Sequence, residues 1–214
     1  MGAWRAGGFR RPLAVALLFS LFSAAPALAQ ATAEDPQATA SHPSPLRPEG
    51  GNVWSVFYGL GLNQEINHSA RNINIASAGV RWTHLWSPKL GGILRGHPGL
   101  GIEIVPVTAF VKDGQIAWAL GGNLLYEHHF LAGRRVLPVW KIGAGFLYAD
   151  REVPAGETRH NFSVLTALGV DVMVAERSAL FLGYRFHHVS NADTGRINPG
   201  INAHTMMFGL TFYR

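Results

Sequence analysis

Apolar and polar residues alternate with a period of two along most of the chain after Val53. This period is typical of β-strands that have one face in an apolar environment and the other in a polar one. Clusters of turn-forming residues separate the alternating segments, and no amphipathic helix of useful length interrupts them. The pattern predicts eight strands, at 53–63, 73–86, 100–111, 115–129, 137–149, 161–174, 179–190 and 200–213.

The two faces of these segments differ consistently, with large apolar residues on one face and polar or small residues on the other. In the second segment, Val80 and Trp82 alternate with Arg81 and Thr83. A soluble lipocalin-like barrel, the alternative, would turn its apolar face inward, whereas a transmembrane barrel turns it toward lipid. We predict an all-β fold, an eight-stranded antiparallel transmembrane β-barrel. Its narrow lumen would hold charges that neutralise one another, namely Arg81, Glu103, Glu127, Lys141, Asp171 and Arg185.

Aromatic residues near the strand ends are expected to form girdles at the two membrane interfaces. If the chain enters from the periplasm, the connections 64–72, 112–114, 150–160 and 191–199 face the cell exterior. The connection 87–99 is then unusually long for the periplasmic side, and the sequence assigns it no role. The predicted girdle residues are Trp54, Trp82, Trp86, Trp140, Tyr148, Phe212 and Tyr213.

The N-terminal residues have the pattern of an export signal. Three arginines precede an apolar run from Pro12 to Phe22, and Ala27-Leu28-Ala29 supplies a small-x-small cleavage pattern. The apolar run is much shorter than the roughly 20 residues that span a bilayer as a helix. We therefore predict a signal peptide at 1–29 that is cleaved during export.

The following segment, 30–51, is rich in Pro, Ala, Ser and Thr and has too few large apolar residues to build a core. We predict that it is a disordered periplasmic linker. The remaining residues, 52–214, are expected to form the outer-membrane barrel as one domain.

Composition excludes several classes of protein. The chain has no cysteine, so disulfides, a lipoprotein anchor, thiolate metal sites and cysteine nucleophiles are all excluded. The formal charge of +5 comes largely from the signal, because removal of its three arginines leaves fifteen Lys and Arg against thirteen Asp and Glu. We therefore expect no nucleic-acid partner. We also expect no metal at His128-His129, because adjacent strand residues point to opposite faces.

Candidate chemistry lies around the last predicted turn. His188 and Ser190 continue the lipid-facing row of segment 179–190, and Asn202 lies on the same exterior side of segment 200–213. Such a set can cleave an ester if His188 takes the proton of Ser190 and a third group orients the imidazole. The alternative is that these polar residues merely lie at the membrane interface, which tolerates them.

The sequence His188-x-Ser190-Asn191-Ala192, followed by Asn198-Pro199-Gly200 and a final amphipathic strand, resembles the PagL-type lipid A 3-O-deacylases of the outer membrane, also grouped as acyloxyacyl hydrolases. The detailed match runs from about Gly183 to the C-terminus. The resemblance implies hydrolysis of the ester at position 3 of the lipid A glucosamine, with lipid A of lipopolysaccharide as substrate and without cofactor or metal.

By the family's pattern, Ser190 is the nucleophile, His188 the general base, and Asn191, Asn198 and the backbone near Gly200 stabilise the oxyanion. The acidic member of the family's triad falls at Asn202 here. An asparagine carbonyl can accept a hydrogen bond from the imidazole but supplies no negative charge, which another carboxylate such as Asp193 would have to provide. The acyl chain is expected to lie along Tyr184, Phe186 and Met206.

Two other functions compete with the esterase. A non-catalytic structural or adhesive barrel of the opacity or OmpA-like kind would need neither Ser190 nor His188. A small solute channel is disfavoured by the narrow, charged lumen. The sequence carries no signal for an oligomeric state.

Overall fold

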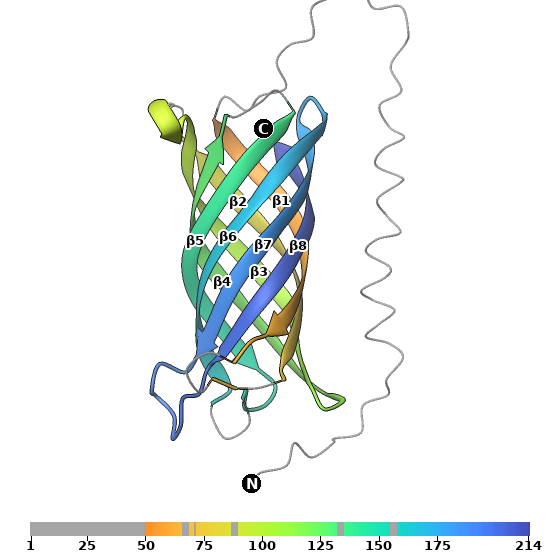
Figure 1. The fold of residues 1–214 in the computed structure, drawn as a ribbon, viewed down its shortest axis with the longest axis vertical. Helices are drawn as coiled ribbons and strands as arrows, with labels where there is room; N and C mark the ends of the chain where they lie inside the picture. Colours follow the sequence, from red (N-terminus) through yellow and green to blue (C-terminus); the bar gives the residue numbers. More distant parts are fainter. Residues whose placement is uncertain (1–49, 66–68, 71, 87–89, 132–134, 155–157) are drawn as a thin grey trace, which may run out of the picture. The chain divides into compact units, whose positions relative to one another are not determined.

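The computed structural model describes residues 50–65, 69–70, 72–86, 90–131, 135–154 and 158–214. The predicted signal peptide and nearly all of the predicted linker lie outside the described residues. Eight antiparallel strands each pair with the next along the chain, and the last pairs with the first to close a barrel (Figure 1). Their bounds are β1 Gly51–Asn63, β2 Asn74–Leu85, β3 Gly96–Lys112, β4 Gln115–Phe130, β5 Val136–Ala149, β6 His160–Ala175, β7 Ser178–Ser190 and β8 Ile201–Tyr213.

The predicted eight-stranded barrel is confirmed, and all predicted strand ends but one agree with the structure within two residues. The exception is β3, which begins at Gly96 instead of residue 100. Its first four residues pair with Glu127 to Phe130 of β4, so the connection from β2 is shorter than predicted. This connection contains a single turn of 3₁₀ helix, η2 (Gly92–Leu94). Among the described residues, no helix is long and apolar enough to span a membrane.

Every second side chain of the strands faces outward, and these outward side chains are mostly large and apolar. Leu62, Leu124 and Leu168 are more than 60% exposed, whereas the residues between the outward positions are buried. An apolar outer wall around a polar interior is the polarity of a membrane barrel. The soluble, lipocalin-like alternative is therefore excluded.

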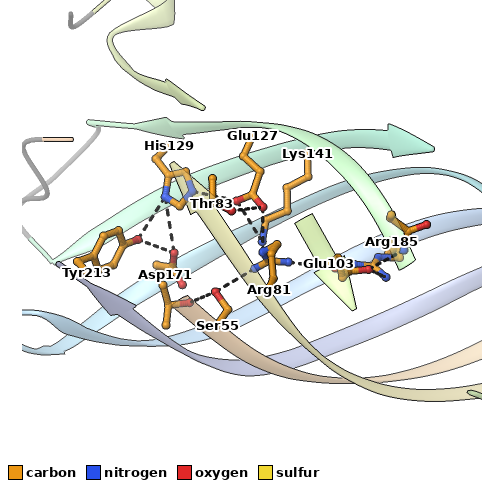
Figure 2. A network of polar contacts seen from close by, with 12 residues as sticks. Ser55, Arg81, Thr83, Glu103, Glu127, His129, Lys141, Asp171, Arg185 and Tyr213 are labelled. Atoms are coloured by element: carbon orange, nitrogen blue, oxygen red, sulfur yellow. Dashed lines mark hydrogen bonds and ion pairs between the residues drawn. The ribbon is translucent and has the colours of Figure 1, made fainter. Parts of the chain in front are cut away.

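The lumen is filled by a network of charged side chains (Figure 2). Glu103, fully buried, accepts two hydrogen bonds from Arg185, at 3.0 and 2.7 Å, and one from Arg81 at 3.4 Å. Arg81 also lies 2.9 Å from Glu127, whose other oxygen lies 3.8 Å from Lys141 Nζ. With Asp171, three carboxylates face three cations, so the predicted interior set is present and balanced in charge. Paired charges of this kind fill the interior at much lower cost than isolated ones.

One residue of the last strand, Tyr213, lies in this interior although the sequence placed it at the membrane interface. Tyr213 was predicted in the interfacial girdle, but its side chain is 5% exposed and its hydroxyl donates to Asp171 Oδ2 at 2.6 Å. The residue has odd parity on β8, and the odd positions of this strand face the lumen. The girdle assignment of Tyr213 is therefore wrong, and Phe212 is the outward neighbour.

Candidate active site

Strands β7 and β8 bring the predicted polar row together on the outer wall. In their register His188 faces Asn202 directly, and Phe186 faces His204. The ten-residue connection 191–200 joins the two strands at the barrel end opposite the C-terminus (Figure 1). His188, Ser190 and Asn202 therefore lie on one face because of strand parity and because these two strands are neighbours.

A short hydrogen bond joins the two facing residues. His188 Nδ1 lies 2.7 Å from Asn202 Oδ1. Since an amide oxygen only accepts, Nδ1 must carry the proton, which leaves the lone pair of Nε2 available as a base. Asn202 is 8% exposed, and its backbone carbonyl accepts hydrogen bonds from Gln64 N at 2.9 Å and Asn63 Nδ2 at 3.0 Å. The start of β8 is thus fixed against the end of β1.

Gly200 borders both His188 and Ser190. It has φ +61°, and a Cβ atom at this position would lie 3.0 Å from His188 Cε1 and 3.5 Å from Ser190 Cβ. A side chain here would be strained and would push against the imidazole. Within the described part of the chain the Ser190 hydroxyl forms no side-chain hydrogen bond, so rotation about its single χ1 bond sets where the hydroxyl points.

The predicted oxyanion residues Asn191 and Asn198 are built into the 191–200 connection. Asn191 is fully buried, its Nδ2 donates to Ile197 O at 2.9 Å, and its Oδ1 accepts from Asp193 N at 3.0 Å. Asn198 Oδ1 accepts from Asn191 N at 3.3 Å, and its Nδ2 donates to Asp193 Oδ1 at 3.0 Å. Both amides therefore brace the loop, and their part in oxyanion stabilisation stays a prediction. Asp193 contacts Asn198, while the imidazole partner is Asn202.

The predicted acyl-chain residues lie on the outer wall next to this site. Tyr184 is 39% exposed and Met206 47%, and the two are direct partners across β7 and β8. Phe186 packs edge-on against His204, with ring centroids 5.4 Å apart, and the Tyr184 hydroxyl forms a hydrogen bond with His204 Nδ1. We did not predict a role for His204, although its parity on β8 places it in the same row as Asn202.

On the other side of β7, strand β6 completes the surroundings of the site. Phe162 pairs with Ser190 and Val164 with His188. Both side chains are about half exposed, at 45% and 55%. The serine and histidine therefore have an apolar wall on the β6 side and a mixed apolar and polar wall on the β8 side. No group of three or more His, Asp or Glu that could hold a metal occurs within the described ranges.

A closed barrel with an apolar outer wall defines the class of outer-membrane β-barrels, and this barrel has serine, histidine and asparagine on the rim where β7 ends and β8 begins. Residues 56–211 match the family model described as lipid A 3-O-deacylase (PagL). This match spans well over half of the chain, so the protein belongs to the PagL family of lipid A 3-O-deacylases. The predicted family and the outer-membrane location are thereby confirmed.

Solved structures show the same fold at low sequence identity. The crystal structure of the outer-membrane enzyme PagL is similar with a TM-score of 0.55 and 16% identity, over 72% of this chain and 97% of that one. The crystal structure of Neisserial surface protein A (NspA) is similar with a TM-score of 0.51 and 9% identity, over 77% and 97% of the two chains. At these identities the similarity concerns the fold alone. No curated protein sequence matches the chain.

Proposed function

We propose that this protein hydrolyses the ester at position 3 of lipid A with Ser190 as nucleophile, His188 as general base and Asn202 as the group that orients the imidazole. The observation that carries the proposal is the 2.7 Å contact between His188 Nδ1 and Asn202 Oδ1 next to Ser190 on the lipid-facing rim. A base held by a third group beside a hydroxyl is the arrangement that activates a serine.

In the first half of the reaction, Ser190 Oγ attacks the carbonyl carbon of the ester while His188 Nε2 takes the hydroxyl proton. The carbonyl electron pair moves onto oxygen and returns when the bond to the sugar oxygen breaks. His188 gives its proton to that oxygen, which leaves as the 3-hydroxyl of the glucosamine. The acyl group is then esterified to Ser190. In the second half, water attacks the acyl-enzyme with His188 again as base, and a free fatty acid leaves.

Asn202 fixes the tautomer of His188 but adds no charge. The imidazolium that forms during the attack is therefore stabilised by the amide dipole alone, which is a weaker interaction than one with a carboxylate. On a wall that faces lipid, a neutral partner has a compensating advantage, because it avoids the cost of holding an extra carboxylate in an apolar environment. We infer a slower enzyme than one with an acidic residue at this position.

The substrate reaches the site from the side of the barrel. Lipid A occupies the outer leaflet, and its acyl chains run parallel to the wall, so the ester meets Ser190 without entering the lumen. The acyl chain lies along Tyr184, Phe186 and Met206, which are exposed or half-buried on this wall. The protein reaches the outer membrane after cleavage of its signal peptide behind Ala29.

The test is mass spectrometry of lipid A from cells that express the wild type, Ser190→Ala or Ser178→Ala at matched outer-membrane levels. Ser178 lies on the same strand as Ser190 but at the opposite end, so its substitution controls for the loss of a β7 hydroxyl. We expect the wild type and Ser178→Ala to remove one hydroxylated acyl chain and Ser190→Ala to leave lipid A unchanged. Deacylation by Ser190→Ala would refute the assigned nucleophile.

A non-catalytic barrel is the second candidate function. It is favoured by the neutral residue at position 202 and by the absence of a hydrogen bond to the Ser190 hydroxyl among the residues that the structure describes. Unmodified lipid A with the folded wild type, in the same experiment, would support this candidate and would overturn the esterase.

A further inference from the structure

The connection between β2 and β3 exposes an unusual number of large apolar side chains. Ile93 in η2 is 96% exposed, Leu94 is 50% exposed and Leu90 is 38% exposed. Trp86, the residue directly after β2, is 40% exposed. Isolated exposed apolar residues are ordinary, but a cluster on one short turn marks a surface that contacts another apolar phase.

This turn is held in place by the neighbouring strand β4. The carbonyl of Leu94 lies 3.1 Å from His128 Nε2, and the carbonyl of Arg95 accepts from Leu131 N at 2.9 Å. His128 is 2% exposed, and its ring packs edge-on against Phe130 with centroids 4.3 Å apart. The apolar side chains of η2 are therefore presented from a fixed backbone.

The position of η2 on the barrel determines which phase it meets. The turn lies at the end where β1 begins and β8 ends, and it projects sideways beyond the strands (Figure 1, short yellow-green coil). Trp140, a predicted interfacial residue, pairs directly with His128 beneath this turn. At the same end Trp54 is 47% exposed on the outer wall. The turn thus lies at the end of the barrel that carries these residues of the predicted aromatic girdle, which marks where the apolar layer of a bilayer ends.

The charge at this end of the barrel favours an anionic partner. Among the described residues of this rim, one exposed glutamate, Glu176, accompanies four exposed arginines. Arginines beside apolar groups match the phosphates and acyl chains of phospholipids. The four arginines are Arg95, Arg135, Arg177 and Arg214.

We propose that residues 90–95 form a membrane anchor that inserts Ile93 and Leu94 into the phospholipid layer of the periplasmic leaflet. The rigid attachment to β4 makes the insertion depth a fixed property of the barrel. The anchor lies on one side only, so it sets the tilt of the barrel and with it the height of the β7–β8 rim in the outer leaflet. This inference does not depend on the esterase mechanism.

The absence of cysteine from the chain permits a direct test with a single-label variant. Ile93→Cys, labelled with the fluorophore NBD, is folded into vesicles of phosphatidylethanolamine and phosphatidylglycerol that contain nitroxide-labelled acyl chains. Glu176→Cys, in the exposed β6–β7 turn at the same end, is the matched control. Folding of both variants is checked by the heat-dependent shift in gel mobility, and the high exposure of both positions predicts no effect.

We expect blue-shifted emission at position 93 and at least twofold stronger quenching by the acyl-chain nitroxide than at position 176. Equal, water-like emission and weak quenching at both positions would overturn the anchor, and would leave η2 as a surface for a soluble partner. Strong quenching at both positions would also overturn it, because insertion would then be general to this rim and would not depend on η2.

Discussion

His188 and Asn202 are direct cross-strand partners joined by a 2.7 Å hydrogen bond on the lipid-facing side of the barrel. In the proposed mechanism this bond combines a base with a neutral orienting group, at the position where the family pattern has an acidic residue. The arrangement separates two roles that a carboxylate performs together, namely fixing the tautomer and stabilising the imidazolium. Variants of Asn202 can therefore measure the two roles independently.

The first prediction concerns these two roles. Asn202→Ala removes the tautomer contact and should lower kcat by roughly 10- to 100-fold. Asn202→Asp retains the contact and adds a negative charge, whose attraction to the imidazole increases as the imidazolium forms. This should raise kcat about tenfold, which corresponds to an activation free energy lower by about 1.4 kcal/mol. Both rates are measured on purified lipid A in detergent, with KM close to the wild-type value. A slower Asn202→Asp enzyme would show that the neutral residue is required.

The second prediction concerns Gly200. Gly200→Ala places a methyl group 3.0 Å from His188 Cε1 at a positive φ, so we expect kcat to fall at least tenfold and the free energy of unfolding to fall by about 1 kcal/mol. Gly114→Ala is the matched control. Gly114 has φ +74° but nothing within 4 Å of a Cβ, so this variant has the backbone strain without the contact. Equal losses of activity in the two variants would contradict a role for the contact.

The third prediction concerns the loop that carries Asn198 and Gly200. Asn191→Ala removes the bonds to Ile197 O and Asp193 N, each worth about 1 kcal/mol. The loop should then open more often, and trypsin should cleave after Arg196 about tenfold faster. The initial cleavage rate of the folded barrel measures this effect. The control Asn74→Ala, an exposed asparagine at the start of β2, should leave the rate unchanged.

The fourth prediction concerns the interior network. Glu103→Gln leaves Arg185 and Arg81 in the lumen without their shared carboxylate, which should lower the free energy of unfolding by about 3–5 kcal/mol. Glu176→Gln, at an exposed turn, should change it by less than about 0.5 kcal/mol. Urea unfolding of both variants in lipid vesicles gives the comparison. A small loss with Glu103→Gln would mean that water enters the lumen and screens the arginines.

Much of the fold follows from parity in the sequence. A strand side chain faces lipid or lumen according to whether its position is odd or even, so the alternation around Arg81 was sufficient to orient β2. The same rule, together with the pairing of neighbouring strands, predicted that Asn202 lies on the outer face of the barrel, as His188 does. The start of β3 could not be predicted in this way, because Gly96 to Gly99 lack the alternation and are strand through their pairing with β4 and, at Gly99, with β2.

The details of the site depended on contacts that the sequence does not contain. The family pattern suggested Asn191 as an oxyanion donor, but in the structure its side-chain amide forms hydrogen bonds with the backbone of Ile197 and Asp193. These bonds arise from how the loop turns back on itself at the positive φ angles of Ala192 and Asp193. Tyr213 was misplaced for a related reason, since an aromatic residue near a strand end suits either an interface or a buried hydroxyl contact.

The seam between β1 and β8 has a consequence for when the protein becomes active. Asn202 lies on β8, and pairing of β8 with β1 is the step that closes the barrel. The backbone of Asn202 is itself held by Asn63 and Gln64 at that seam. Pairing of β7 with β8 brings serine, histidine and asparagine together, but the contacts that hold the Asn202 backbone form only when β8 pairs with β1. A chain still crossing the periplasm therefore lacks the contacts that fix the proposed site.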